Sequence, residues 1–446
     1  MKTTLRKSNA FGRQTIDSGL KQLLQSRNLS EDGFNPQNNR VKQLFRVILF
    51  LTVIWSFSNA PAANQVIGWG RNDYHQSVPP ASITNEIAIG AGLFHSLAWN
   101  GSGKVAGWGD NSVGQTNAPG GFTSIVPISA TNSITNIVTN IFTVASGGYH
   151  GLALLTNGTV GAWGDFSAGQ TDVPTNLSNV VSISGGFYHN LALKSDGTVT
   201  SWGTGTNNLQ DGVDYDQALV PSNLSNVVAV CAGGWHSLVL KSDGTLTAWG
   251  RNNVGQGSIP AGLSNIVAIS AGAAHNLALK PNGTVTAWGD NTYGQTNIPV
   301  AASNVVAIAA GGWHCLALRN DGSVVAWGDN DYPTTGTNRV VSGQATVPVN
   351  VTNVSAIAAG GWHSLALAGS GPPSAHVAIT NVHWNSNYFT LSIPAHNGRV
   401  YQIEYNNSLT NTVWKTLPLV AGVEGTLPVK DFTATNAARV YRMRQW

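Results

Sequence analysis

The segment NIVAISAGAAHNLALKPNGTVTAWGDNTYGQTNIP, Asn265 to Pro299, sets the architecture because close variants of it recur along the chain. IVAIS and NLALK are short apolar runs, PNGT carries an Asn-Gly hairpin turn, TVTAW is a third run and QTNIP a short fourth. Each unit therefore predicts four small antiparallel strands. Repeated units of this kind form the blades of a β-propeller.

Two motifs mark each copy of the repeat, and successive occurrences of each motif are most often 39 residues apart. The histidine of the AAHNLAL segment recurs at His95, His150, His189, His236, His275, His314 and His363. The Trp-Gly pair recurs at Trp69, Trp108, Trp163, Trp202, Trp249, Trp288 and Trp327. The sequence therefore predicts an all-β, seven-bladed propeller over residues 63–371.

The first and last copies are incomplete in complementary ways. QVIGWG, Gln65 to Gly70, has no histidine segment before it, and NVSAIAAGGWHSLALAGSG, Asn353 to Gly371, has no Trp-Gly after it. We therefore expect the N-terminal strand to pair with the last repeat. Such pairing closes the ring and removes the exposed edges of an open array.

The pattern G-W-H-S-L-A-L-x-x-D-G-x-V-x-A-W-G-x-N-x-x-G-Q resembles the regulator of chromosome condensation repeat family, whose fold is a seven-bladed β-propeller. The endings GQTNIP, GQTNAP and GQATVP are similar to those of a secreted bacterial member, the propeller-type β-lactamase inhibitory protein. Eukaryotic chromatin-bound members have Leu-Gly after Gly-Gln, and this chain does not. Guanine-nucleotide exchange and nucleosome binding are therefore not expected.

Charge divides the chain in two. Residues 1–62 hold nine Lys/Arg against three acids, a balance of +6, so the total of +3 leaves −3 for the remainder. A mildly acidic body lacks the cationic surface that dominates nucleic-acid affinity. We expect no nucleic-acid partner.

Residues 1–62 are interpreted as a leader. VILFLTVIWSF, Val47 to Phe57, follows Lys42 and Arg46 and precedes a small-x-small site at Ala60-Pro61-Ala62. Its eleven residues are too few for a bilayer span, which needs about 20. Cleavage would leave no stable membrane span and a secreted, periplasmic or cell-surface protein; the alternative is a retained signal anchor.

The repeated polar residues are interpreted as structural. Sevenfold repetition places the histidines around a ring instead of on one metal ion, and buried imidazoles find hydrogen-bond partners. The tryptophans are expected to pack between blades. Cys231 and Cys315 occupy different places in different repeats, so we expect two free, buried thiols.

Carboxylates cluster in two kinds of loop. Asp110, Asp165, Asp290 and Asp329 follow Trp-Gly, where such side chains cap turns. An insertion holds Asp211, Asp214 and Asp216, which could bind calcium, but their spacing fits no standard calcium loop and a solvated loop is favoured. We predict no metal site and no cofactor.

The residue before each histidine is aromatic in six of the seven copies. These candidate partner-binding residues are Phe94, Tyr149, Tyr188, Trp235, Trp313 and Trp362, and the seventh is Ala274. They either pack on the adjacent blade or display a binding surface, since aromatic residues dominate binding hot spots. Strand parity places them on the face of the enlarged loops Thr204–Asp216 and Asp331–Ser342, and the insertion after Pro119 on the opposite face. The resemblance to the inhibitory protein implies that such a rim contacts a partner protein.

Pro372-Pro373 mark a linker, and alternating runs such as YFTLSIP and RVYQIEY predict a small C-terminal β-sandwich over residues 372–446. The first functional hypothesis is an exported, non-enzymatic propeller that binds a protein through its aromatic rim. The alternative is a carbohydrate- or cell-wall-binding surface protein. A hydrolase or polysaccharide lyase ranks third, because no Ser-His-Asp, Cys-His or paired-carboxylate set stands apart from the repeats.

Overall fold

A computed structural model gives the architecture of the chain. It describes residues 64–100, 105–119, 123–124, 138–139, 141–205, 214–333, 339–369, 380–384, 389–395, 400–406, 415–417, 419–421, 425–431 and 440–445. The predicted leader, Asp211 and most of the insertion after Pro119 lie outside these residues. The described residues belong to one compact unit, residues 61–446.

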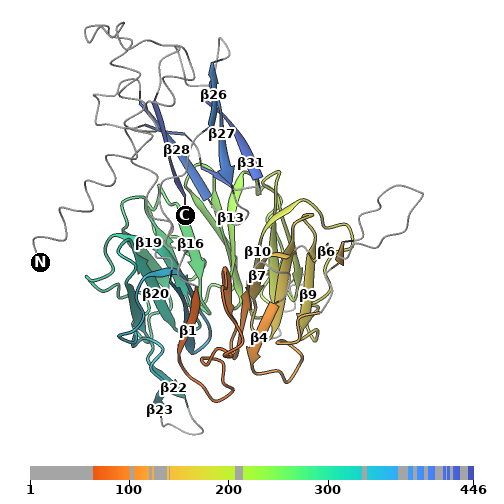
Figure 1. Ribbon diagram of the computed structural model, residues 1–446, viewed down its shortest axis with the longest axis vertical. Helices are drawn as coiled ribbons and strands as arrows, with labels where there is room; N and C mark the ends of the chain where they lie inside the picture. Colours follow the sequence, from red (N-terminus) through yellow and green to blue (C-terminus); the bar gives the residue numbers. More distant parts are fainter. Residues whose placement is uncertain are drawn as a thin grey trace, which may run out of the picture. The chain divides into compact units, whose positions relative to one another are not determined.

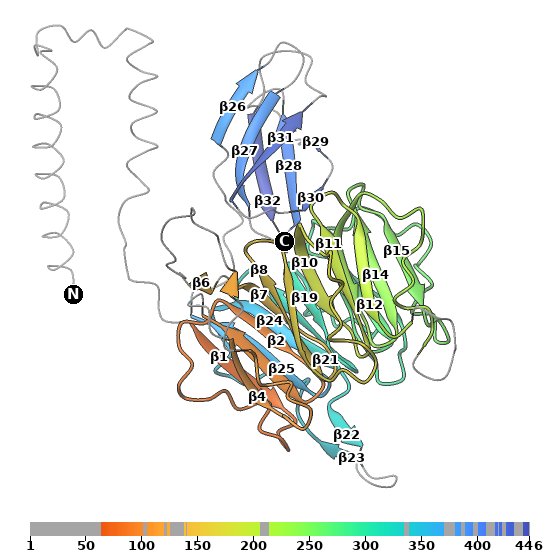
Figure 2. The same ribbon diagram turned by 90° about the vertical axis from the view of Figure 1, so that its right-hand side faces the viewer.

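Seven three-stranded antiparallel sheets form the blades (Figures 1 and 2). Six of them use consecutive strands: β2 (Ala88–Ala91), β3 (His95–Trp99) and β4 (Val105–Gly109); β7 (Ile141–Ser146), β8 (His150–Leu155) and β9 (Val160–Gly164); β10 (Val180–Gly185), β11 (His189–Lys194) and β12 (Val199–Gly203); β13 (Val227–Ala232), β14 (His236–Lys241) and β15 (Leu246–Gly250); β16 (Ala268–Ala271), β17 (His275–Leu279) and β18 (Val285–Gly289); β19 (Val305–Ala310), β20 (His314–Arg319) and β21 (Val324–Gly328). The predicted all-β propeller is confirmed.

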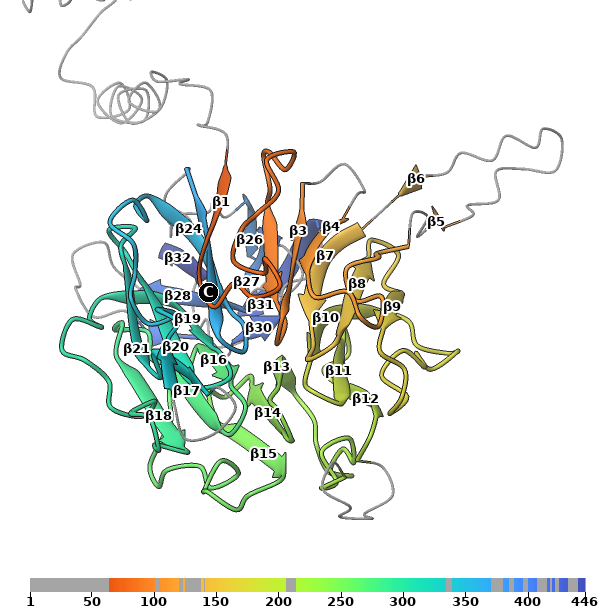
Figure 3. The ribbon, with the colours of Figure 1, turned by 90° about the horizontal axis from the view of Figure 1, so that it is seen from below.

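The seventh blade contains both ends of the repeat region. β1 (Gln65–Gly70) pairs antiparallel with β25 (His363–Ala368), which also pairs with β24 (Val354–Ala359). The register runs from Gln65↔Ala368 to Gly70↔His363. Figure 3 shows β1, drawn red, beside the blue strands of the last repeat. The pairing that the two incomplete copies predict is therefore present.

The prediction of four strands per blade is wrong, because each blade has three. The segment expected as a fourth strand forms turns, as in the bond from Asn297 N–H to the Gly294 carbonyl at 3.0 Å. In the same segment the Gln295 carbonyl accepts from the Trp327 indole at 2.8 Å instead of from a ladder partner.

Middle strands read as continuous apolar runs because they lie between neighbouring blades. β17, HNLAL, is buried at all five positions, and Leu277 packs in a core that joins three successive repeats. Strands buried on both faces lose the usual alternation of polar and apolar residues. First strands such as β16 carry small residues, Ala-Ile-Ser-Ala, which lets seven of them approach the axis.

Other strands lie outside the blades. The second enlarged loop contains β22 (Asp331–Pro333) paired with β23 (Arg339–Val341), and the insertion after Pro119 contains β5 (Thr123–Ser124) paired with β6 (Val138–Thr139). None of the described residues forms a helix long and apolar enough to cross a membrane.

Residues 380–445 form two small antiparallel sheets with a shared core that includes Leu391, Tyr401 and Ile403. One sheet holds β26 (Thr380–Trp384), β27 (Phe389–Ala395) and β31 (Gly425–Asp431); the other holds β28 (Val400–Asn406), β29 (Lys415–Thr416), β30 (Val420–Ala421) and β32 (Val440–Gln445). Leu419 packs against the propeller core and donates its N–H to the Ser242 carbonyl at 2.9 Å. The domain boundary at residue 372 stays a prediction.

Candidate functional site

A tryptophan-to-glutamine bond joins neighbouring repeats all round the ring. Each Trp-Gly indole donates Nε1–H to the carbonyl of the equivalent glutamine in the preceding repeat, as Trp108 does to Gln76 at 2.9 Å. Glycine precedes this glutamine in five copies, whereas His75 precedes Gln76 and Asp216 precedes Gln217. The donors are Trp69, Trp108, Trp163, Trp202, Trp249, Trp288 and Trp327. The bond from Trp69 to Gln344 at 3.0 Å spans the closure of the ring.

The histidines form a second ring of contacts. All seven are 0% exposed, and six of them join Nε2 to the side chain that follows the next repeat's histidine. Examples are His236 to Asn276 Oδ1 at 2.8 Å and His363 to Ser96 Oγ at 2.9 Å. Among the described residues His95 has no side-chain partner, because the corresponding position is Gly151.

Burial fixes the charge state of this ring. It lowers the pKa of every histidine from 6.5 to about 3 or 4, so all seven are neutral at pH 7. His275 contacts Cys315 Sγ at 3.2 Å, and both cysteines are free. Cys315 is buried as expected, whereas Cys231 is only partly buried. Burial raises the pKa of the Cys231 thiol to about 12. At pH 7 the seven histidines are therefore uncharged and the Cys231 thiol is protonated.

The Asp residues after Trp-Gly cap their loops, as predicted. Asp110 Oδ1 accepts from Ser112 N–H at 3.0 Å, and its Oδ2 accepts from Gln115 Nε2 at 2.9 Å. Among the described residues there is no group of three His, Cys, Asp or Glu that could hold a metal ion. Asp214 is buried and accepts from Asp216 N–H at 3.2 Å.

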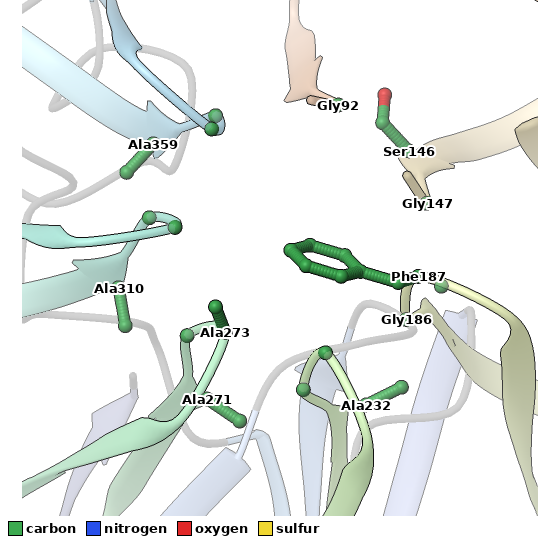
Figure 4. A pocket seen from close by; sticks show the side chains of 18 of the residues that line it. Gly92, Ser146, Gly147, Gly186, Phe187, Ala232, Ala271, Ala273, Ala310 and Ala359 are labelled. Atoms are coloured by element: carbon green, nitrogen blue, oxygen red, sulfur yellow. The ribbon is translucent and has the colours of Figure 1, made fainter. Parts of the chain in front are cut away.

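The turns between first and second strands surround a cavity of about 160 Å³ on the propeller axis (Figure 4). Glycine is required at the start of these turns, because a Cβ on Gly92 would collide with the His95 ring. Figure 4 shows one large side chain, Phe187, pointing into the cavity among glycine, alanine and serine residues.

The predicted rim residues end these same turns, and all six aromatic rings are half-buried. The rings of Trp313 and Trp362 stack at 4.3 Å, and Trp362 stacks on Phe94 at 5.2 Å. The ring centroids of Phe94 and Tyr149 lie 5.9 Å apart. The structure thus brings four of the six into one continuous cluster.

A second cluster surrounds Trp235. Its ring lies 6.3 Å from that of Tyr188 and 5.0 Å, edge-on, from that of Phe187. Ala274, at the seventh position, separates Trp235 from Trp313. The rings pack on one another between adjacent blades and keep part of their area exposed on one rim. Their role in partner binding stays a prediction.

Backbone bonds place the Trp-Gly loops beside this rim. The residue after each Trp-Gly donates its N–H to the carbonyl of a rim residue, as Asp110 does to Phe94 at 2.8 Å and Asp165 to Tyr149 at 3.0 Å. Thr204, which opens the first enlarged loop, bonds Tyr188 at 2.9 Å in the same way. Rim and enlarged loops therefore begin on one face.

Three residues of the rim were not predicted. Phe187 could have been found from the repeat, because the other copies have Leu93, Gly148, Gly234, Ala273, Gly312 and Gly361 at its position. Arg71 lies over Phe94 at 5.0 Å, and Arg251 over Trp235 at 5.3 Å. The repeat places both arginines at the rim, since each follows Trp-Gly as Asp110 does, but it does not show that their side chains lie over aromatic rings.

Seven three-stranded blades around an axial cavity define the class of this protein as a β-propeller. The regulator of chromosome condensation (RCC1) repeat matches the sequence six times, at residues 87–115, 143–170, 180–208, 227–256, 266–295 and 305–332. The chain is an RCC1-repeat propeller. Its seventh blade, split between the two ends of the repeat region, lies outside these matches.

Two solved structures of yeast RCC1-type proteins share the fold, and a third structure is similar at a lower TM-score. Prp20p from Saccharomyces cerevisiae is 18% identical, with a TM-score of 0.51 over 70% of this chain and 92% of that chain. Yeast RCC1 (Prp20) bound to Kap60 is 20% identical, with a TM-score of 0.52 over 70% and 89%. Human WBSCR16 is 20% identical, with a TM-score of 0.49 over 70% and 100%. No curated protein sequence matches the chain.

Proposed function

We propose that this chain is an exported, non-enzymatic propeller that binds a partner protein through its aromatic rim. The observation that carries the proposal is the half-exposed cluster of Trp313, Trp362, Phe94 and Tyr149 around the mouth of the axial cavity. Large, rigid rings at the centre of a surface contribute most of the energy in many interfaces. The basic leader with its short apolar core supports export.

Prp20p, which shares the fold, binds Gsp1p and histones. At such low identity the likeness supports a shared fold, and the partner of this chain has to be found from its own surface. The seven repeated histidines are buried and hydrogen-bond between neighbouring blades, so they serve the fold. This supports a binding role over a catalytic one.

Affinity capture from the culture fluid of the source organism tests the proposal. We expect the full chain to retain a protein that the triple variant Trp235→Ala, Trp313→Ala, Trp362→Ala does not retain. The matched control is Val300→Ala with Val349→Ala, since these side chains are 98% and 99% exposed away from the rim. Thermal unfolding of the triple variant is measured alongside, because each substitution removes a half-buried ring as well as ring contacts worth about 0.5–1.5 kcal/mol beyond the buried area. Equal capture by wild type and triple variant would overturn the proposal, and unfolding of the variant would favour packing as the role of the rings.

A further inference from the structure

We infer that the rim recognises a lysine- or arginine-bearing segment of its partner, held against Tyr149 between Asp110 and Asp165. This inference rests on the proposed function and adds the chemistry of the partner. Its basis is the charge carried by the loops beside the rim.

Asp110 and Asp165 flank the rim directly, since their N–H groups bond the carbonyls of Phe94 and Tyr149. Each carboxylate accepts hydrogen bonds only from neutral groups among the described residues. Asp165 accepts from Ser167 N–H at 2.9 Å, Ser167 Oγ at 3.0 Å and Gln170 Nε2 at 3.0 Å. Neither carboxylate has a cation within ion-pair distance in the part of the chain that the structure describes. Both therefore present an uncompensated negative charge beside half-buried aromatic rings.

The opposite face has the contrary arrangement. In the hairpins between second and third strands, Lys194 pairs with Asp196 at 3.5 Å and Arg319 with Asp321 at 3.1 Å. Its carboxylates thus have cations of their own chain nearby. Charge complementarity selects partners and speeds their association, so the unequal faces favour a cationic partner at the rim.

The rim already holds cations of its own chain. Arg71 lies over the rings of Phe94 and Trp362 at 5.0 and 5.5 Å, and Arg251 lies over Trp235. Tyr149 belongs to the first cluster, with its ring centroid 5.9 Å from that of Phe94, and no described cation lies over its ring. The neighbouring charges act on it, since burial first, and then Tyr188, Asp110, Tyr74 and Asp165, raise the pKa of its hydroxyl. A guanidinium or ammonium group placed here would meet an aromatic face and two carboxylates.

Peptide titration with the full chain tests the inference. Fluorescein-labelled hexalysine, hexaarginine and hexaglutamate serve as probes, with binding followed by fluorescence anisotropy. We expect Asp110→Asn with Asp165→Asn to weaken binding of the two cationic peptides by about tenfold or more. Asparagine can still cap the same turns, so folding should be kept. The matched control, Asp196→Asn with Asp243→Asn, removes the same charge from the opposite hairpins and should change binding less than about twofold.

Equal weakening by both pairs, or binding of hexaglutamate as tight as that of hexalysine, would overturn the inference. Its failure is distinguishable from failure of the proposed function. Capture that needs the rim tryptophans but tolerates Asp110→Asn with Asp165→Asn leaves the function standing and overturns the cationic partner. Cationic peptides that need the two carboxylates, without any rim-dependent protein capture, support the cation site and overturn the proposed function.

Discussion

Deleting Gln65–Gly70 is expected to destabilise the propeller more than deleting the whole of residues 374–446. The short deletion removes the third strand of the seventh blade and leaves β25 with an exposed edge. It also removes Trp69, which is 6% exposed and bonds Gln344 across the closure. Loss of such a ring costs about 3–5 kcal/mol even as a single Trp→Ala substitution.

Thermal unfolding followed by circular dichroism measures both effects. The variant Trp69→Ala in the full chain is the milder form of the experiment, and Val300→Ala is its surface control. Deletion of residues 374–446 should cost less, because Leu419 is the one described residue of that segment that belongs to a propeller core cluster. A larger loss from the C-terminal deletion than from the N-terminal one would contradict closure by β1.

Acid is expected to unfold the protein sharply, at about pH 5 to 6. The seven histidines have folded pKa values of about 3 or 4 and an unfolded value of 6.5, so the unfolded chain binds more protons between these limits. Stability is therefore present above pH 6.5 and lost as the pH falls below it. At pH 5.5 the seven neutral histidines lower the free energy of unfolding by on the order of 10 kcal/mol, which is comparable with the whole stability of a domain. Glu86 opposes this weakly, because burial raises its pKa to about 7.

Acid titration followed by tryptophan fluorescence, with proton uptake measured on unfolding, checks this expectation. His236→Leu and His95→Leu are matched variants, since each removes one titrating group. His236→Leu leaves the buried Asn276 Oδ1 without its histidine partner, while Asn276 Nδ2 keeps its bond to the Gln256 carbonyl at 2.8 Å. It should cost about 1–3 kcal/mol more at pH 7 than His95→Leu, which breaks no side-chain bond among the described residues. A native state that persists at pH 4 would show that the buried ring accepts protons, contrary to the neutral state inferred from its burial.

The repeat made most of the fold predictable. Spacing, Asn-Gly turns and the two incomplete copies were sufficient for the blades and for the pairing of β1 with β25, because each blade is a local unit that needs only its neighbours. The fourth strand was wrongly predicted because QTNIP looks extended, whereas its backbone bonds are taken by turns and by the tryptophan indole. A local sequence pattern does not show which donor will hydrogen-bond a given backbone carbonyl.

The sequence was sufficient to place the residues of the candidate site, but not to show how their side chains pack. Rim aromatics and capping aspartates are fixed by the repeat, so their residue numbers follow from alignment alone. The stacking of Arg71 and Arg251 and the entry of Phe187 into the cavity depend on packing between blades. The missing side-chain hydrogen bond of His95 likewise becomes evident only when Gly151 is placed opposite it.

Hydroxyl-radical footprinting of the captured complex decides whether the rim is the binding surface, because it reports which aromatic rings a partner covers. We expect oxidation of Trp235, Trp313, Trp362 and Tyr149 to fall severalfold on binding, while Phe166, which is 76% exposed, serves as the internal reference for radical dose. Rim rings oxidised equally in the free and bound protein, with protection confined to the opposite hairpins or to residues 380–445, would contradict binding through the rim.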